Sequence, residues 1–210
     1  MIIARRSLLA MPAIAAASAL AVPARAETAL DVAMADRAIG SPDAKVVVAE
    51  WYSLTCPHCA RFSIEALPRI KAEQVDTGRL RIVFKDFPLD QVALMAAMVA
   101  RSLPVDRYVP FVEALLASQA RWAYARGINT TDELAKMAAL AGMPRPAFDA
   151  AIADSALRNA ILKAQEDAEK TLSIDSTPTF VINGPKVTNR KETGEQSPEA
   201  FAKFVTDAQA

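Results

Sequence analysis

The chain has 210 residues, of which 52% are hydrophobic and 23% charged, and its 24 Lys and Arg residues balance its 24 Asp and Glu residues. This composition argues against an intrinsically disordered chain and gives no reason to expect a nucleic acid as a partner. A chain of this length can bury a core without disulfides, so its two cysteines need an explanation other than stability.

Residues 1–26 have the pattern of an export signal. Two arginines precede an alanine-rich apolar run, and the segment ends in an Ala-Arg-Ala cleavage pattern. We expect a signal peptide that is cleaved before Glu27, with export to the periplasm by the Sec or the twin-arginine route. An uncleaved membrane anchor is the alternative, although the apolar run is short for a span and contains Pro12.

A buried strand followed directly by a helix is predicted around the cysteines. The run "VVVAEWY" is apolar, begins with β-branched residues and follows a turn-like Gly-Ser-Pro-Asp segment. Pro57 suits the first turn of a helix, because its missing N–H has no helical partner there. Apolar residues then recur at helical spacing until Pro68, which should kink or interrupt the helix.

The rest of the chain divides into a strand, a block of helices and a closing strand-strand-helix unit. Apolar and polar residues alternate over residues 80–88, "LRIVFKDFP", as in a strand. Residues 91–172 carry alanine, leucine and methionine at helical spacing. "TPTFVING" and "PKVTN" then predict a hairpin closed by an Asn-Gly turn, and "SPEAFAKFVTDA" predicts a terminal helix. The whole pattern indicates an α/β fold.

The stretch "SLTCPHCAR" holds both cysteines and the only histidine of the chain. A structural zinc site needs four ligands, and two thiols with one imidazole are too few. A purely structural disulfide between Cys56 and Cys59 would close a very short loop, and stabilisation by a disulfide grows with loop length. A soft copper site, or one completed by carboxylates, remains an alternative.

A redox role explains this spacing directly. The first cysteine lies at the start of the predicted helix, where unpaired N–H groups and the helix dipole lower the pKa of a thiol. We therefore expect Cys56 to be the nucleophile and Cys59, one turn later, to be the more buried resolving thiol. His58 adds a donor or a positive charge toward the Cys56 thiolate, which makes the disulfide more oxidising.

These residues resemble the DsbA-like thiol-disulfide oxidoreductases of the thioredoxin fold, which carry Cys-Pro-His-Cys, with the proline at Pro57, at this position. "GSPDAKVVVAEWYSLTCPHCARF" is similar to the first strand and active-site helix of that family, and "STPTFVING" is similar to its loop before the third strand. The resemblance implies a thioredoxin-like domain formed by residues 27–90 and 173–210. It also implies an inserted helical domain over residues 91–172.

The resemblance implies further site residues. Glu50, six residues before Cys56, matches a buried acid that exchanges a proton with the resolving cysteine, and an acid inside an apolar strand is unusual because its burial is costly. Lys85 stands where a partner for this acid is expected, with a solvated lysine as the alternative. Thr177 and Pro178 match the cis-proline loop, whose backbone pairs with an extended substrate peptide.

The resemblance also implies a function and its partners. We expect a periplasmic enzyme that oxidises the dithiols of exported proteins, without cofactor or metal, and that a DsbB-like membrane partner reoxidises. A reductase or isomerase is an alternative, because Thr177 replaces the valine of the best-known oxidase, and so is a copper-binding thiol carrier. About 18 residues separate the expected cleavage site from the first predicted strand. This is too little for a separate dimerisation domain, so a monomer is expected.

Overall fold

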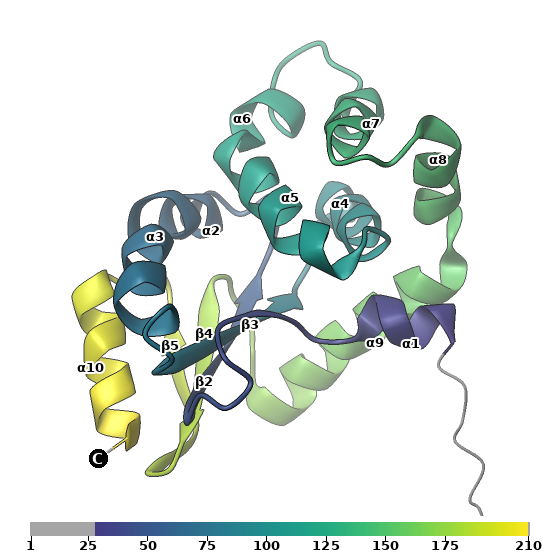
Figure 1. Cartoon of the computed structure of the whole chain (residues 1–210). Coiled ribbons are helices and arrows are strands. Elements are labelled where there is room, and N and C mark those ends of the chain that lie inside the picture. Colours follow the sequence, from purple (N-terminus) through teal and green to yellow (C-terminus); the bar gives the residue numbers. More distant parts are fainter. Residues whose placement is uncertain (1–27, 210) are drawn as a thin grey trace, which may run out of the picture.

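The computed structural model describes residues 28–209 (Figure 1). The expected signal peptide, residues 1–26, lies outside the described residues. Within the described part of the chain, no helix is both long enough and apolar enough to cross a membrane.

A five-stranded sheet lies at the centre, with the strand order β1-β3-β2-β4-β5. Its strands are β1 (Arg37–Ile39), β2 (Val46–Tyr52), β3 (Leu80–Asp86), β4 (Thr179–Gly184) and β5 (Val187–Thr193). Strands β2 and β3 are parallel, and the other neighbours are antiparallel. The four strands predicted from alternation and turn signals are confirmed. The three-residue β1 was not predicted, because it is too short to show a period.

Helices cover both faces and one end of this sheet (Figure 1). In chain order they are α1 (Ala29–Met34), α2 (Pro57–Arg61), α3 (Leu67–Ile70), α4 (Gln91–Arg101), α5 (Val105–Ala117), α6 (Gln119–Trp122), α7 (Thr130–Leu140), α8 (Arg145–Ala153), α9 (Ser155–Leu172) and α10 (Pro198–Gln209). Two π-helical segments, η1 (Phe62–Ala66) and η2 (Lys71–Val75), follow α2 and α3. We call α4 to α9, which lie between β3 and β4 in the chain, the helical insert.

The pleat of the sheet sorts its side chains between two hydrophobic layers. On one face, Phe180 of β4 packs against Phe62 and Phe201, with ring centroids 4.8 and 5.0 Å away. On the other face, Trp51 and Val181 pack in a smaller cluster that includes Ala168 of α9. Neighbouring residues of one strand therefore serve opposite layers, as the period of two requires.

The helix after the cysteines is interrupted as predicted. Pro68 has no N–H to donate to the helix. Leu67, the residue before it, donates its N–H to the Phe62 carbonyl, which lies five residues earlier in the chain rather than the four of an α-helix. This wider turn lets the helical path pass the proline and continue to Val75.

A buried polar cluster joins the helical insert to the sheet. Arg101 of α4 forms an ion pair with Asp86 at the end of β3, and both side chains are buried. The hydroxyls of Tyr52 and Tyr108 lie 2.8 Å apart, and each lies 3.3 Å from Asp86 Oδ1. Arg101 Nη1 also donates to the Ala33 carbonyl at 3.0 Å, so the cluster connects α1, β3, α4 and α5.

Candidate active site

The two cysteines lie where β2 gives way to α2. Cys56 is the N-cap residue of α2, Pro57 occupies the first turn, and Cys59 follows on the same helix. Both side chains are free thiols; Cys59 is fully enclosed, while Cys56 keeps a small exposed part of 3%. The predicted order of strand, Cys-Pro-His-Cys and helix is confirmed.

The Cys56 thiolate is strongly stabilised. A hydrogen bond from the Cys59 thiol is the largest cause that lowers the pKa of Cys56, to about 5, and burial opposes it. The Thr177 side chain and the backbone N–H groups of Cys59 and His58 lower the pKa further. At neutral pH the reduced protein therefore carries a thiolate at Cys56.

Cys59 is shifted in the opposite direction. Burial is the main cause that raises the pKa of Cys59, and the hydrogen bond and charge of Cys56 raise it further. The negative charge of Glu50 also raises the pKa of Cys59, which shows that the structure brings this acid close to the second sulfur. Cys59 thus stays protonated and donates to its neighbour, and the expected division between the two thiols has a physical basis.

The loop before β4 lies against Cys56. The Thr177-Pro178 peptide bond is cis, as the resemblance implies. When Cys56 is protonated, its thiol donates to the Thr177 carbonyl oxygen with an Sγ to O distance of 3.3 Å. The Thr177 hydroxyl oxygen is buried and has no hydrogen-bond partner among residues 28–209 of the dithiol form. Thr177 therefore offers a carbonyl acceptor to the Cys56 thiol and a hydroxyl to its thiolate.

Glu50 is enclosed in β2 as a lone acid. Only 2% of the residue is exposed, and within the part of the chain that the structure describes its Oε2 atom has no partner. Burial raises the pKa of Glu50 to about 8, so the carboxyl group is mostly protonated at neutral pH. A buried neutral acid near Cys59 fits the proton-exchanging role that the resemblance implies.

Lys85 does not reach Glu50, and the expected pairing of these two side chains is wrong. In the parallel register of β2 and β3, Glu50 stands beside Phe84 and Trp51 stands beside Lys85. Because side chains alternate along a strand, Lys85 points to the face opposite Glu50. Its Nζ atom lies 2.5 Å from Asp36 Oδ1 instead.

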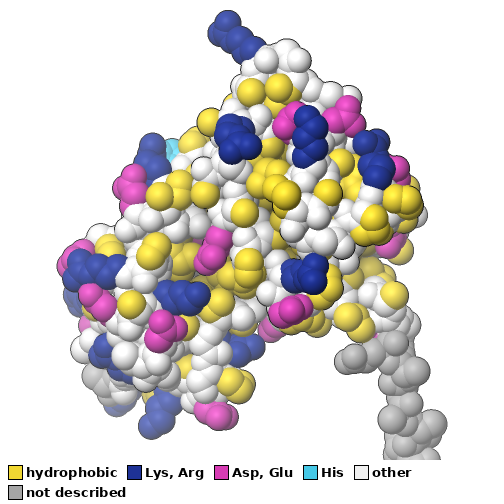
Figure 2. Space-filling model, turned by 45° about the horizontal axis from the view of Figure 1, so that its top comes forward, with side chains coloured by type: hydrophobic (Ala, Val, Ile, Leu, Met, Phe, Trp, Pro, Cys, Tyr) yellow, Lys and Arg dark blue, Asp and Glu magenta, His cyan; other side chains and the backbone are white. Residues whose placement is uncertain are grey.

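His58 projects from the site surface into an ionic cluster. Its Nδ1 atom contacts Glu195 and lies 2.8 Å from Arg61 Nη2, and Arg61 Nε lies 3.0 and 3.1 Å from the two Glu195 oxygens. Figure 2 shows the imidazole, in cyan, at the surface beside a basic side chain. The lowering of the Cys56 pKa by His58 comes from its backbone N–H.

Sequence reasoning missed Arg61 and Glu195. Hydrogen bonds from Arg61 and then His58 lower the pKa of Glu195 to about 2, so a permanent carboxylate stands at the edge of the site. Glu195 lies 137 residues after His58, and no local pattern could have paired them.

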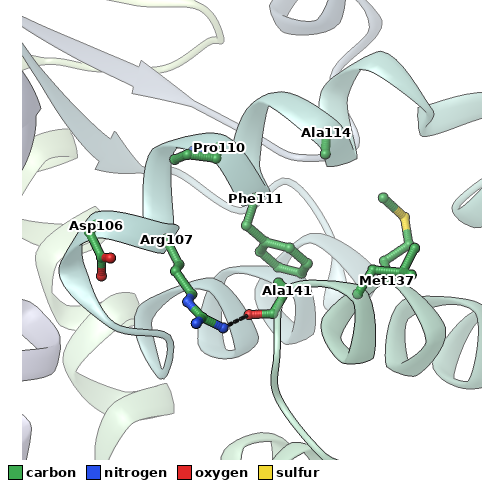
Figure 3. A pocket seen from close by; sticks show the side chains of 8 residues that line it. Asp106, Arg107, Pro110, Phe111, Ala114, Met137 and Ala141 are labelled. Carbon is green, nitrogen blue, oxygen red and sulfur yellow. Dashed lines mark hydrogen bonds between the residues drawn. The ribbon is translucent and has the colours of Figure 1, made fainter.

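One groove of the helical insert lies apart from the predicted site residues. It lies between α5 and α7, has a volume of about 490 Å³, and is lined by apolar side chains such as Phe111 and Met137. Figure 3 shows Arg107 donating to the Ala141 carbonyl at one end of this groove, a contact of 2.7 Å. None of the predicted site residues lines this groove.

Metal ligands are scarce in the described chain. Among residues 28–209 no group of three or more His, Cys, Asp or Glu side chains is placed to hold an ion. Cys56 and Cys59 are the two thiols that a soft metal would find in this part of the chain.

Comparison with known proteins identifies a family and several relatives of this chain. The profile of a thioredoxin family matches residues 33–207. A Rickettsia prowazekii protein with a provisional name as a protein-disulfide oxidoreductase is 26% identical over 155 residues, 73% of this chain and 56% of that protein. The chain thus spans little more than half the length of the first curated relatives it matches. A Bacillus anthracis protein with the provisional name disulfide bond formation protein D is 23% identical over 70% of each chain.

Solved structures agree with these sequence matches. The crystal structure of Wolbachia pipientis alpha-DsbA1 is similar with a TM-score of 0.76 and 29% identity, covering 83% of this chain and 91% of that one. A protein-disulfide isomerase from Novosphingobium aromaticivorans shares the fold with a TM-score of 0.68 at 23% identity, covering 81% of this chain and 95% of that one. The resemblance and the fold expected from the sequence, including the helical insert, are confirmed.

Proposed function

This chain belongs to the thioredoxin family, and from that premise we propose that it is a thiol-disulfide oxidoreductase of the DsbA type. Its principal reaction is the oxidation of dithiols in exported proteins by a Cys56-Cys59 disulfide. The observation that carries the proposal is the opposite shift of the two thiols, with the pKa of Cys56 lowered to about 5 and that of Cys59 raised. A stable Cys56 thiolate favours the reduced enzyme, so the disulfide is a strong oxidant.

The reaction proceeds by two thiolate displacements. A substrate thiolate attacks Cys56 Sγ, the Cys56-Cys59 bond breaks, and Cys59 leaves with the electron pair. The second substrate thiolate then attacks the substrate sulfur of the mixed disulfide and expels the Cys56 thiolate. The low pKa of Cys56 makes this sulfur the better leaving group in the second step.

Glu50 supplies the proton that the first displacement requires. The Cys59 thiolate forms in a buried place where its charge is unfavourable. Burial keeps the Glu50 carboxyl mostly protonated at neutral pH, so it holds a proton close to the departing sulfur. Thr177 and Pro178 face Cys56 on the other side, and we assign them to the binding of an extended substrate peptide.

The setting of the reaction follows from the export-like segment and the family. We place the protein in the periplasm as a monomer, with thiol-containing exported proteins as substrates and a DsbB-like membrane protein as its reoxidant. The pattern of residues 1–26 supports export, and the disulfide-related names of the relatives support thiol-containing substrates.

Equilibration of the purified protein in glutathione buffers tests the direction of the reaction. We expect a reduction potential closer to the value of about −120 mV known for DsbA than to the value of about −270 mV of thioredoxin. The Cys59→Ser variant is the control, because it cannot form the internal disulfide. A reduction potential near that of thioredoxin would overturn the assignment of the protein as an oxidase.

Disulfide isomerisation is the second candidate, because Thr177 precedes Pro178. Refolding of a substrate with scrambled disulfides separates the two candidates from each other. An isomerase would correct the scrambled substrate faster than it oxidises the reduced one, whereas an oxidase would do the reverse.

A further inference from the structure

Three successive carbonyl oxygens, of Leu54, Thr55 and Cys56 itself, accept hydrogen bonds from one short segment of the helical insert. Gln119 Nε2 donates to the carbonyl oxygens of Leu54 and Cys56 at 2.8 and 3.1 Å. Between them, the Thr55 carbonyl accepts from the Tyr124 hydroxyl. The loop that carries the reacting sulfur is therefore held from outside the thioredoxin-like part of the fold.

The donating segment is itself firmly anchored. Gln119 begins α6 and is only 6% exposed. Trp122, at the end of the same helix, is buried and donates through Nε1 to the Leu115 carbonyl at 2.8 Å. Asp90, the N-cap of α4, accepts from the Thr55 hydroxyl at 2.7 Å. Side chains of the insert thus bind both the backbone and a side chain of the loop.

We propose that Gln119, together with Tyr124, is a positioning residue for the thiol-disulfide exchange at Cys56. The inference rests on the proposed function, which makes Cys56 the attacked sulfur. Gln119 acts through the backbone: it fixes the loop so that the N–H groups of His58 and Cys59 and the Thr177 side chain stay directed at Cys56 Sγ. Its amide also brings the positive end of a dipole to the residue that carries the thiolate.

Fixing the loop and supplying a donor both stabilise the Cys56 thiolate. A loosened loop weakens the hydrogen bonds to the Cys56 thiolate, and a lost donor removes a favourable dipole beside it. Without Gln119 the thiolate should be less stable, and the disulfide should be a weaker oxidant. The helical insert would then set the reactivity of the nucleophile as well as covering the sheet.

Gln119→Met in the full chain tests this inference, because methionine has a similar length and no donor. The matched control is Gln74→Met, since Gln74 is 4% exposed and lies in η2, which packs against α3 and β3. Thiolate absorbance against pH reports Cys56, and equilibration with glutathione reports the disulfide. For Gln119→Met we expect a higher pKa of Cys56 in the absorbance titration. We also expect the equilibrium constant with glutathione to shift about fivefold toward the disulfide form of the protein, which corresponds to the net contribution of one hydrogen bond. Gln74→Met should change neither.

An unchanged midpoint and equilibrium in a folded Gln119→Met protein would overturn the inference, and so would equal shifts in both glutamine variants. If Gln119→Met does not fold, Tyr124→Phe decides, because Tyr124 is 55% exposed and only its hydroxyl is lost. A smaller shift in the same direction supports the inference, and no shift contradicts it. The thiolate titration requires no substrate, so failure of the wild type to oxidise dithiols would refute the proposed function without deciding this test.

Discussion

At neutral pH the two cysteines and Glu50 are in three different states. Cys56 is a thiolate, Cys59 is a thiol and Glu50 is mostly a neutral acid. Hydrogen-bond donors around Cys56 outweigh its desolvation, whereas burial dominates at the other two groups. A site with this order can release Cys59 as a thiolate and return a proton to it without drawing on solvent.

Glu50→Gln should make the stability of the protein less sensitive to a rise in pH between about 4.5 and 8. Burial raises the pKa of Glu50 from an ordinary value of 4.5 to about 8. Between these values the folded protein keeps a proton that the unfolded chain releases, so this group's contribution is fully favourable below pH 4.5 and is lost as the pH rises to 8. Glutamine should gain about 3 kcal/mol over wild type between about pH 5 and pH 8.

Urea unfolding of the reduced proteins at these two pH values measures the gain. Cys56 stabilises the folded state with the opposite pH dependence, but it does so in both proteins and cancels in their difference. Glu65→Gln, at an exposed position after α2, is the control and should show no such gain. Parallel pH profiles for wild type and Glu50→Gln would refute the burial of an unpaired acid.

At the scale of the elements, the turn between β1 and β2 fixes how the edge strand joins the sheet. Gly40 has a φ of +95°, and a Cβ atom there would lie 2.5 Å from the Leu80 carbonyl oxygen and 3.0 Å from Val75. The close contact is with the backbone at the start of β3, which cannot move without disturbing the central pair of strands.

Gly40→Ala should therefore destabilise the protein by about 3 kcal/mol, through backbone strain and steric overlap together. Gly78→Ala is the matched control, because Gly78 also has a positive φ of +75° but a Cβ atom there would meet nothing within 4 Å. It should cost only roughly 1–2 kcal/mol, from the backbone alone. Urea midpoints of the two variants check the difference, and equal losses would contradict the role of the Leu80 contact.

The sequence predicted the elements with clear periods and missed what depends on distant partners. Alternation and helical spacing located β2, β3 and the helical insert, while α1 and β1 are too short to show a period. Lys85 was assigned to Glu50 because the register of two parallel strands cannot be read from either strand alone. The contact of His58 with Glu195 joins segments 137 residues apart, and only the fold brings them together.

For the molecule as a whole, the cluster around Asp86 couples the insert to the sheet. Arg101 and Asp86 are both buried, so removal of one charge leaves the other without its partner in a place of low polarity. Because the cluster connects α1, β3, α4 and α5, we expect the sheet and the insert to unfold together.

Arg101→Met should lower the free energy of unfolding by about 3–5 kcal/mol. Arg145→Met is the control, since Arg145 pairs with Asp132 and Asp149 at the surface, where solvent screening leaves such pairs little effect on stability. Urea unfolding followed by far-UV and near-UV circular dichroism should show one coincident transition for each protein. A small loss for Arg101→Met, or separate transitions in wild type, would contradict this coupling.

The hydrogen bond between Cys56 and Thr177 also has a consequence for the order in which the protein is made. Its two ends are 121 residues apart in the chain, and a ribosome adds roughly 5–20 residues per second. The cysteine pair therefore emerges roughly 6–24 s before the loop that completes its surroundings. During that interval Cys56 lacks the Thr177 side chain, which lowers the pKa of Cys56 in the folded protein, so the Cys56 thiolate is less stable in the newborn chain than in the finished protein.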